Sequence, residues 1–296
     1  MELFLGSAEQ GLIYGLMTIG IFISYRILNV ADLTVDGSFT LGAAVSIVFT
    51  AAGHPVLGIL LAILAGALAG TVTAFLQTKL KIQPILAGIL TMTALYTINL
   101  AVMGNRPNMS LLYENTIFTK PVEWLGSWGK LATVLAVCAV CVGLISLFLH
   151  TRLGLSVRAT GDNEDMVRSS SINADVMKFI GLALSNALVA LSGALLCQYQ
   201  QFTDISMGTG MVIIGLASLV IGEVVLGWSK LLLIASVAGT ILYRLIYALA
   251  LQFNVPVMYM KLVTAVFVIL AISYPVIVGK AKLLAQKRRT NHAIDQ

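Results

Sequence analysis

The sequence contains few charged residues. Asp, Glu, Lys and Arg make up 10% of its 296 residues, whereas hydrophobic residues make up 58%. A soluble domain usually has about 25% charged residues, and its interior has too little room for so much apolar surface. Lipid accepts such a surface, because a membrane-spanning helix needs about 20 mostly apolar residues. The composition therefore excludes an ordinary soluble protein and predicts an integral membrane protein.

Cysteine and histidine are also scarce, with three residues of each. The pair Cys138 and Cys141 has the C-x-x-C spacing, but neither a second cysteine pair nor a nearby histidine completes a redox or metal site. We interpret the cysteines as small apolar residues that pack in lipid-embedded helices. No paired acids or nucleophile–base arrangement accompanies the scattered histidines, so the sequence argues against a membrane enzyme and against catalytic or metal sites.

Two further signals are missing from the sequence. Residues 1–5 have no positively charged region, so we expect no cleavable signal peptide. The ATP-binding pattern Gly-x-x-x-x-Gly-Lys-[Ser/Thr] does not occur either. Gly129 and Lys130 come nearest, but Trp124 occupies the first glycine position and Leu131 the last. The chain therefore lacks this device for holding ATP, and we expect it to bind no cofactor itself.

Long stretches without charge mark the predicted helices. Residues 37–78 form one such stretch, which the turn signal Gly53-His54-Pro55 divides. The fold class predicted is an all-α polytopic membrane protein, with a single transmembrane domain over residues 1–296. About nine spans are expected, near residues 7–28, 34–52, 55–78, 84–103, 130–150, 176–200, 208–227, 230–252 and 257–278.

The third predicted span carries small residues at every fourth position. These are Ala62, Gly66, Gly70 and Ala74. Positions four apart lie on one face of a helix, and small residues let helix backbones approach closely in membranes. We therefore predict that this face packs against another helix.

The distribution of Lys and Arg predicts the orientation. If the basic tail at residues 279–296 is cytoplasmic, thirteen of the 18 basic residues lie inside and three outside, and two lie within spans. Cytoplasmic loops of membrane proteins carry such an excess of Lys and Arg. We therefore expect an outside N-terminus and a cytoplasmic C-terminus. The basic residues serve as topology signals in this interpretation, not as a nucleic-acid site.

Two short passages resemble each other. Residues 32–35 begin the second predicted span, and residues 204–207 precede the seventh, at an offset of 172 residues. The same offset relates Pro84 to Pro256. Because the two passages enter spans of opposite direction, spans 2–4 and 7–9 would form an inverted repeat, as in many transporters. Chance similarity between apolar helices is the alternative.

Both passages are polar and contain glycine, which suggests helices that are broken within the membrane. Irregular backbone is tolerated there only where protein or a water-filled cavity surrounds it. Polar surface loops with solvated aspartates are the alternative. Under the first hypothesis these residues line the solute pathway, with three weaker candidates from the fourth span. The candidates are Asp32, Thr34, Asp36, Ser38, Asp204, Ser206 and Thr209, and then Thr91, Thr93 and Asn99.

Residues 151–175 form the most polar loop on the predicted cytoplasmic side. Gly161 can end the preceding structure, after which Asp162 or Asn163 can cap a new helix with two acids in its first turn. This predicts a short surface helix, which can either dock in the groove of a partner or be a plain connector. Asn173 is then expected to cap the next span. The residues of the predicted helix are Gly161, Asp162, Asn163, Glu164, Asp165, Met166, Val167, Arg168, Ser169 and Ser170.

A family resemblance favours the partner hypothesis. Residues 158–174 resemble the cytoplasmic coupling loop of ATP-binding-cassette importer permeases, in the branch that serves branched-chain amino acids, ribose and related solutes. Residues 32–35 resemble that branch's Asp-Leu-Ser-Val-Gly motif, and residues 215–223 resemble its Ala-Ala-x-x-x-Gly-Gly passage. The resemblance covers residues 10–278. Three positions depart from the branch, which usually has glycine where this chain has Asp36, Ser171 and Glu223.

The resemblance implies a transport subunit and its partners. We expect a permease in the bacterial cytoplasmic membrane that works with a cytoplasmic ATP-binding subunit, a second permease chain in a homodimer and an extracytoplasmic substrate-binding protein. ATP would bind the partner ATPase. Residues 32–39 look most like permeases for aromatic or branched-chain amino acids. The alternatives are an importer for a sugar or nucleoside and a secondary transporter driven by an ion gradient.

Overall fold

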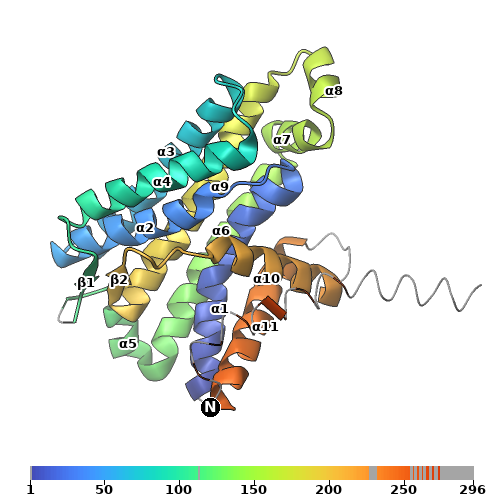
Figure 1. Cartoon of the computed structure of the whole chain (residues 1–296). Helices are drawn as coiled ribbons and strands as arrows, with labels where there is room; N and C mark the ends of the chain where they lie inside the picture. The colour runs from blue at the N-terminus through green and yellow to red at the C-terminus, as the bar shows by residue number, and fades with distance from the viewer. Residues whose placement is uncertain are drawn as a thin grey trace, which may run out of the picture.

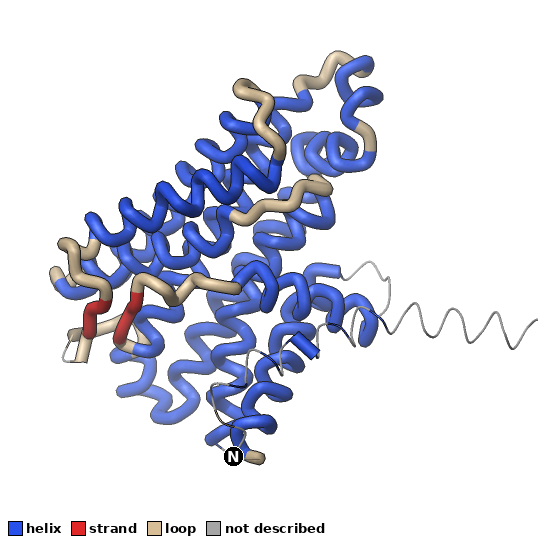
Figure 2. The backbone as a smooth tube through the Cα atoms, in the orientation of Figure 1, coloured by secondary structure: helices blue, strands red, loops and turns tan. Residues whose placement is uncertain are grey.

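The structure, a computed structural model, describes residues 2–112, 114–226 and 232–253, together with single positions between 256 and 273. Helices make up nearly all of it (Figure 1, Figure 2), so the predicted all-α class is confirmed. The strands β1 (Asn108–Ser110) and β2 (Phe202–Asp204) form a small antiparallel pair. The helices are α1 (Glu2–Ile21), the π-helix η1 (Phe22–Ile27), α2 (Thr34–Ala51), α3 (Pro55–Thr78), α4 (Pro84–Val102), α5 (Thr119–Leu125), the 3-10 helix η2 (Gly126–Trp128), α6 (Gly129–His150), α7 (Arg152–Asp162), α8 (Glu164–Ser169), α9 (Ala174–Gln200), α10 (Met211–Leu226) and α11 (Leu232–Gln252).

Six of these helices are long and apolar enough to cross a membrane, namely α2, α3, α4, α6, α9 and α11. Each lies where a span is predicted, and α1 with η1 occupies the place of the first predicted span. The ninth predicted span, residues 257–278, lies outside the described residues apart from single positions, as does the basic tail at 279–296. The total of nine spans stays a prediction.

The two polar passages contain the expected irregular backbone, but only in part. The chain is non-helical at residues 28–33, and regular helix resumes at Thr34. In the second passage, β2 and a series of turns fill residues 201–210, so α10 has 16 residues and is shorter than the predicted span. Gly210 ends these turns at φ 87°, a backbone conformation that glycine adopts without steric cost.

The helix α9 is central in the described bundle, and α1, α2 and α3 pack around it (Figure 1). The closest contacts lie at glycines. A Cβ atom at Gly42 of α2 would collide with the carbonyl of Ala190, and one at Gly66 of α3 would collide with the carbonyl of Asn186. The small-residue face of α3 is buried against α9, so its predicted packing role is confirmed.

We expect Gly42→Val to disrupt the contact between α2 and α9. The added side chain forces the backbones apart, which should lower the free energy of unfolding by about 2 kcal/mol or more. Gly143→Val is the matched control, because Gly143 lies in the membrane-length helix α6 with open space around it. Thermal unfolding of the purified variants in mild detergent measures the difference. Equal destabilisation by both substitutions would contradict the close packing of α2 on α9.

Candidate functional site

The loop between η1 and α2 carries a buried carboxylate. Asp32 is 5% exposed and accepts hydrogen bonds from the backbone N–H of Thr34 at 2.9 Å and the side-chain amide of Asn186 at 2.7 Å. The carbonyl oxygen of that amide accepts a hydrogen bond from the Ser38 hydroxyl at 2.7 Å. The structure thus joins the predicted pathway residues Asp32 and Ser38 through a residue of α9. The alternative of a solvated Asp32 is wrong.

A chain of threonine hydroxyls begins beside this network. The hydroxyls of Thr34 and Thr73 are 2.8 Å apart, and Thr73 donates to the hydroxyl of Thr91 at 3.1 Å. Thr91 in turn donates to the carbonyl of Ala87 in its own helix at 3.0 Å. The chain therefore ties the start of α2 to α3 and α4 and brings two predicted pathway residues together.

Asp36 joins the two polar passages directly. Its carboxylate accepts hydrogen bonds from the backbone N–H groups of Gly210 at 2.8 Å and Val212 at 2.9 Å, at the start of α10. One helical turn further on, the Thr40 hydroxyl accepts a hydrogen bond from the N–H of Gly208 at 3.0 Å. The first N–H groups of a helix need such acceptors, and a carboxylate there also complements the helix dipole. The side chains of α2 therefore cap α10.

The two remaining candidates in α4 lie in different surroundings. Asn99 is buried and donates to the carbonyl of Gly37 at 3.2 Å, which adds it to the polar contacts around α2. Thr93 is exposed, and its hydroxyl donates to the carbonyl of Ile89 in the same helix at 2.8 Å. Thr93 therefore contributes no hydrogen bond to the buried network.

The candidates before α10 lie near the surface. The carboxylate of Asp204 accepts hydrogen bonds from both the N–H and the hydroxyl of Ser206, which closes a local turn after β2. Ser206 and Thr209 are exposed, and Asp204 is half-buried. The structure thus separates the ten predicted pathway residues into two sets. The six that are hydrogen-bonded around α2, all buried except the half-buried Asp36, are called the buried set, and Thr93, Asp204, Ser206 and Thr209, which lie outside that network and are exposed except for the half-buried Asp204, are called the exposed set.

Three residues outside the predicted set hold the buried set together, namely Asn186, Thr73 and Thr40. A signal existed for Asn186, which is an amide in the middle of a mostly apolar predicted span. Thr73 and Thr40 have no such signal, because a threonine in a membrane helix usually bonds to its own helix backbone.

Two charged residues of the predicted spans, Glu223 and Arg244, also interact with other residues of the chain. Glu223 of α10 lies 3.1 Å from Arg26 of η1 in an ion pair. The guanidinium of Arg244 in α11 lies 4.2 Å from the ring centroid of Tyr14, which is a cation–π contact. Glu223 is therefore balanced by a cation from the opposite half of the chain.

The polar loop after α6 forms two helices instead of the one predicted. The hydroxyl of Thr151 caps α7 by accepting the N–H of Gly154 at 3.2 Å. The prediction that Gly161 ends the preceding structure is wrong, because α7 continues through Gly161 to Asp162. Glycine fits at this position of the helix because its backbone packs directly on the carbonyl of Ile27, where a Cβ atom would collide.

The cap of the second helix is Asn163, as predicted. Its side-chain oxygen accepts a hydrogen bond from the N–H of Met166 at 3.0 Å.

Ion pairs fix α8 to its neighbours. The carboxylate of Glu164 lies 2.7 Å from Arg168 and 2.6 Å from Lys178 of α9. Arg168 also lies 2.6 Å from Asp175 of α9, and Asp175 lies 3.3 Å from Lys79 in the connection between α3 and α4. α8 is thereby joined to two other parts of the bundle.

The outer surface of α8 is open. Val167 is 1% exposed and anchors the helix, whereas Met166 is 54% exposed. Asp162, Asn163, Asp165, Arg168, Ser169 and Ser170 are exposed as well. Figure 1 shows α7 and α8 together at one end of the molecule, far from the N-terminus. A helix that is anchored to the bundle and carries an exposed apolar side chain is a suitable docking surface for a partner.

The described residues contain no group of three or more His, Cys, Asp or Glu side chains that could hold a metal ion. Cys138 is buried and Cys141 half-buried in α6, and both are free thiols.

Comparison with known families identifies the class of the chain. The profile of the family described as branched-chain amino acid transport system / permease component matches residues 3–272. The chain belongs to this permease family. The permease is thus a multi-pass protein of the cytoplasmic membrane, and its class is the ATP-binding-cassette transporter permease.

Individual relatives of the permease have transport names. The tyrosine transport system permease protein of Clostridioides difficile (strain R20291) is 37% identical over 265 residues, which cover 88% of this chain and 87% of the relative. The ribose import permease protein of Escherichia coli (strain K12) is 25% identical over 248 residues, which cover 81% of this chain and 75% of the relative. No solved structure gives a significant match.

We expect Asn186→Ala to destabilise the permease strongly. The substitution removes a donor from the buried Asp32 carboxylate and an acceptor from Ser38, which should lower the free energy of unfolding by about 2 kcal/mol. Thr93→Val is the control, because its hydroxyl bonds only to its own helix in the described structure. Thermal unfolding in detergent tests this. A stability loss no larger than that of the control would show that the network contributes little.

Acid should release α8 from the bundle. Hydrogen bonds from Lys178 and Arg168 hold the pKa of Glu164 below its ordinary value. The pKa of Glu164 is therefore lower in the folded protein than in the unfolded chain, where it is about 4.3. The ion pairs of Glu164 give their full stabilisation above the unfolded-state pKa, and this stabilisation is lost as the pH falls through the folded-state pKa. Hydrogen exchange of the α8 amides, corrected for intrinsic rates, should therefore rise on acidification. Glu164→Gln should raise the exchange already at neutral pH, and wild-type behaviour of this variant would contradict the tether.

Proposed function

We propose that this permease is the translocating subunit of an importer for an aromatic or branched-chain amino acid. An extracytoplasmic binding protein would deliver the solute, and a separate ATPase would supply the energy. The observation that carries the proposal is the α7–α8 segment, in which ion pairs hold the exposed helix α8 against α9. The 37% identity to a tyrosine transport permease supports an amino acid as the solute.

In this proposal α8 and its cap receive the movement of the ATPase. The exposed Met166 would enter a groove of the ATPase, and the polar residues around it would form the rim. Movement would pass to α9 through the pair Arg168–Asp175 and to the α3–α4 connection through Lys79. α7 would carry it to η1, because Gly161 lies directly against Ile27.

The solute pathway would lie at an interface between two copies of the permease. The exposed set of Thr93, Asp204, Ser206 and Thr209 offers polar groups to a solute, and the buried set around Asp32 would position α2 and α10 beside it. Because Asp36 caps α10, a shift of α2 would move the start of α10 with it.

We further propose the predicted topology of nine spans, an outside N-terminus, a cytoplasmic C-terminus and one transmembrane domain. Two observations support it. The α7–α8 segment and the N-terminus lie at opposite ends of the molecule (Figure 1), as the predicted sidedness requires. The starts of α2 and α10, the helices that follow the two related passages, meet at Asp36, as halves of an inverted repeat would.

The acidic residues argue against a secondary transporter. Such a transporter needs a carboxylate in the membrane that binds and releases its coupling ion. Asp32 is paired with Asn186, Asp36 with the backbone of α10, and Glu223 with Arg26. Each of these three carboxylates has a protein partner that an arriving ion would have to displace.

Met166→Glu should uncouple the permease from its ATPase without unfolding it, because Met166 is 54% exposed. Loss of a hot-spot contact at the centre of an interface costs about 2 kcal/mol or more, so the ATPase that co-purifies should fall about tenfold or more. Leu112→Glu is the control, since Leu112 is 71% exposed outside the α7–α8 segment.

Quantitative mass spectrometry of the purified permease measures the partner, and uptake of labelled tyrosine in competition with leucine or ribose identifies the solute. If no ATPase co-purifies with the wild type in several mild detergents, the importer proposal is wrong. Competition by ribose alone would assign the permease to sugar import.

A further inference from the structure

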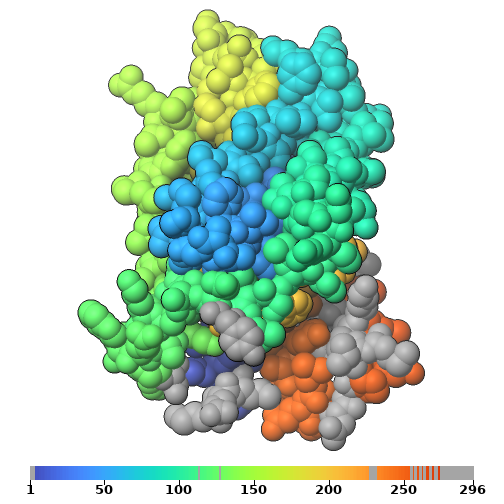
Figure 3. All heavy atoms as spheres, turned by 90° about the vertical axis from the view of Figure 1, so that its left-hand side faces the viewer, coloured from blue at the N-terminus to red at the C-terminus, as the bar shows by residue number. Residues whose placement is uncertain are grey.

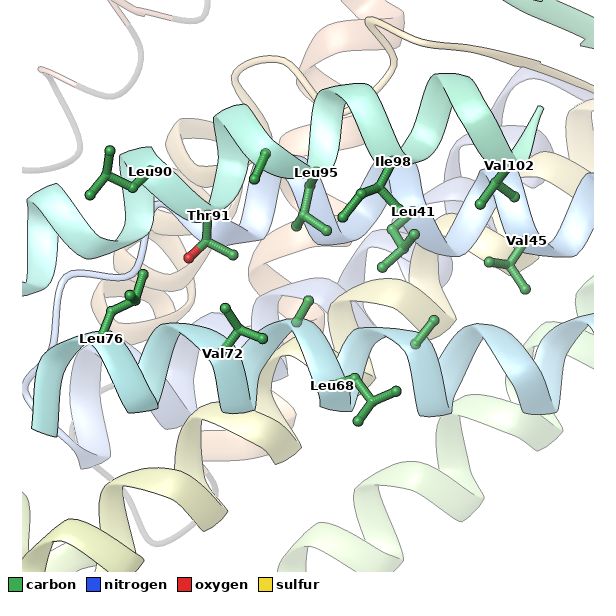
Figure 4. A pocket seen from close by; sticks show the side chains of 13 residues that line it. Leu41, Val45, Leu68, Val72, Leu76, Leu90, Thr91, Leu95, Ile98 and Val102 are labelled. Carbon is green, nitrogen blue, oxygen red and sulfur yellow. The ribbon is translucent and has the colours of Figure 1, made fainter. Parts of the chain in front are cut away.

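The apolar groove between α3 and α4 is not suited to a charged solute. Its volume is about 500 Å³, and it lies on the face where α2, α3 and α4 come to the surface together (Figure 3). Thr91 is the one polar residue among the described residues that line it (Figure 4), and its hydroxyl is already bonded to Ala87 and Thr73. A zwitterion would lose its hydration there without gaining hydrogen bonds. A charged solute therefore needs a charged residue elsewhere in the bundle.

Arg244 is a cation within the membrane-length helix α11 and has no acidic partner. It lies about 12 Å from the end of that helix at Gln252, at the rise of an α-helix. None of the ion pairs among the described residues includes Arg244, and its buried Nε atom has no hydrogen-bond partner there. Charged residues at this depth usually pair with one another or mark the path of a substrate. Arg244 is therefore a candidate for binding an anion.

Two aromatic rings hold the guanidinium of Arg244 between α1 and α11, which lie side by side (Figure 1). The guanidinium lies 4.2 Å from the ring centroid of Tyr14 and 5.4 Å from that of Tyr247. Ring faces attract a cation, but they leave the N–H donors in the plane of the guanidinium without acceptors. Tyr14 is buried and stacks on Phe39 of α2, so the guanidinium lies within the bundle. The side chain of Arg244 is only half-buried, so a ligand can reach the part that is open.

Glu9 of α1 does not supply the missing anion. Its carboxylate is buried and accepts a hydrogen bond from the hydroxyl of Tyr199 at 2.7 Å. The Nζ atom of Lys130 lies 5.1 Å from the centroid of the Tyr199 ring, and the charge of Arg244 also acts on Tyr199. This cluster of Glu9, Lys130, Tyr199 and Arg244 thus contains one acid and two cations. One further negative charge would balance it.

Arg244 lies at the depth where α10 begins. Two close contacts show that α10 and α11 are antiparallel, namely Gly222 on the carbonyl of Ala235 and Gly239 on the carbonyl of Ser218. The same register, continued along both helices, sets Arg244 level with residue 213 of α10. That level is close to Gly210, whose N–H donates to Asp36, and to Thr209 of the exposed set. Arg244 is therefore at the depth of the proposed solute pathway.

We propose that Arg244 binds the carboxylate of the solute during translocation, while Tyr14 and Tyr247 position its guanidinium. This role rests on the proposed import of an amino acid. A guanidinium offers paired N–H donors that match the two oxygens of a carboxylate. The bound carboxylate would add the negative charge that the cluster lacks. A lipid phosphate is not the expected anion, because headgroups lie beyond the ends of spanning helices and Arg244 lies well inside α11.

Thermal unfolding of the purified permease with increasing ligand tests the proposal, because a ligand of the folded state raises the unfolding temperature according to its affinity. L-phenylalanine is compared with L-phenylalaninamide, which keeps the side chain and the ammonium group but lacks the carboxylate. The wild type should bind phenylalanine about tenfold more tightly or more. Arg244→Gln should lose this preference. Arg244→Lys should keep part of it, since the charge remains without the paired donors.

Arg106→Gln is the matched control, because it removes the same charge from an exposed residue outside the cluster. This variant should keep the preference of the wild type for phenylalanine. Size-exclusion chromatography shows whether each variant is folded. If Arg244→Gln does not fold, Arg244→Lys carries the comparison, and it should bind phenylalanine more weakly than the wild type does.

Three results would overturn the proposal. If the wild type binds both ligands equally or neither of them, or if Arg244→Gln keeps the preference, Arg244 does not bind the carboxylate. Equal stabilisation by sodium acetate and by phenylalanine would make Arg244 a site for anions in general. Recovery of the stability of Arg244→Gln by the second substitution Glu9→Gln, without any effect of ligand on the wild type, would make Arg244 a counter-charge for Glu9.

Uptake of labelled phenylalanine by cells separates the failure of this role from the failure of the proposed function. Equal uptake with the wild type and with Arg244→Gln would overturn the role of Arg244 alone. Uptake of ribose but of no amino acid by the wild type would overturn the proposed function, and the carboxylate site with it.

Discussion

The side-chain amide of Asn186 holds together the part of the bundle on which the other contacts depend. It lies on α9 and donates to Asp32 of the η1–α2 loop, while its oxygen accepts from Ser38 of α2. In a bilayer no water replaces such bonds, so a buried carboxylate persists only where protein donors surround it. With the loop held in this way, α2 lies close enough to α9 for Gly42 to contact the Ala190 backbone.

Further contacts extend from this junction in two directions. Toward α10, Asp36 accepts the N–H groups of Gly210 and Val212 at the start of that helix, and Thr40 accepts the N–H of Gly208 in the turn before it. Toward α8, α9 itself carries the connection, because Asp175 in its first turn pairs with Arg168. The central helix therefore links the exposed α7–α8 segment with the polar network around α2, which is the mechanical connection that a coupled transporter needs.

Local signals predicted much of the fold and part of the site. Pro55 and Pro84 begin α3 and α4, and Asn163 and Asn173 cap the helices that follow them, as expected from residues within a single turn. The helix α7 was missed because Gly154 and Gly161 disfavour a helix locally. Both glycines pack against backbone carbonyls, of Phe148 and Ile27, and this packing is not visible in the sequence.

The sequence by itself determined that the chain is helical and embedded in the membrane, where α3, α4 and α8 begin, and which family it resembles. These properties depend on composition and on residues within a few positions of each other. Only the tertiary structure decided which polar residues are buried partners and which are exposed. Asp32 and Asn186 are 154 positions apart, so their bond forms only once α2 and α9 pack together. The sequences of apolar helices do not specify which helix packs against which. An apolar helix surface is about as stable in contact with lipid as in contact with another apolar helix.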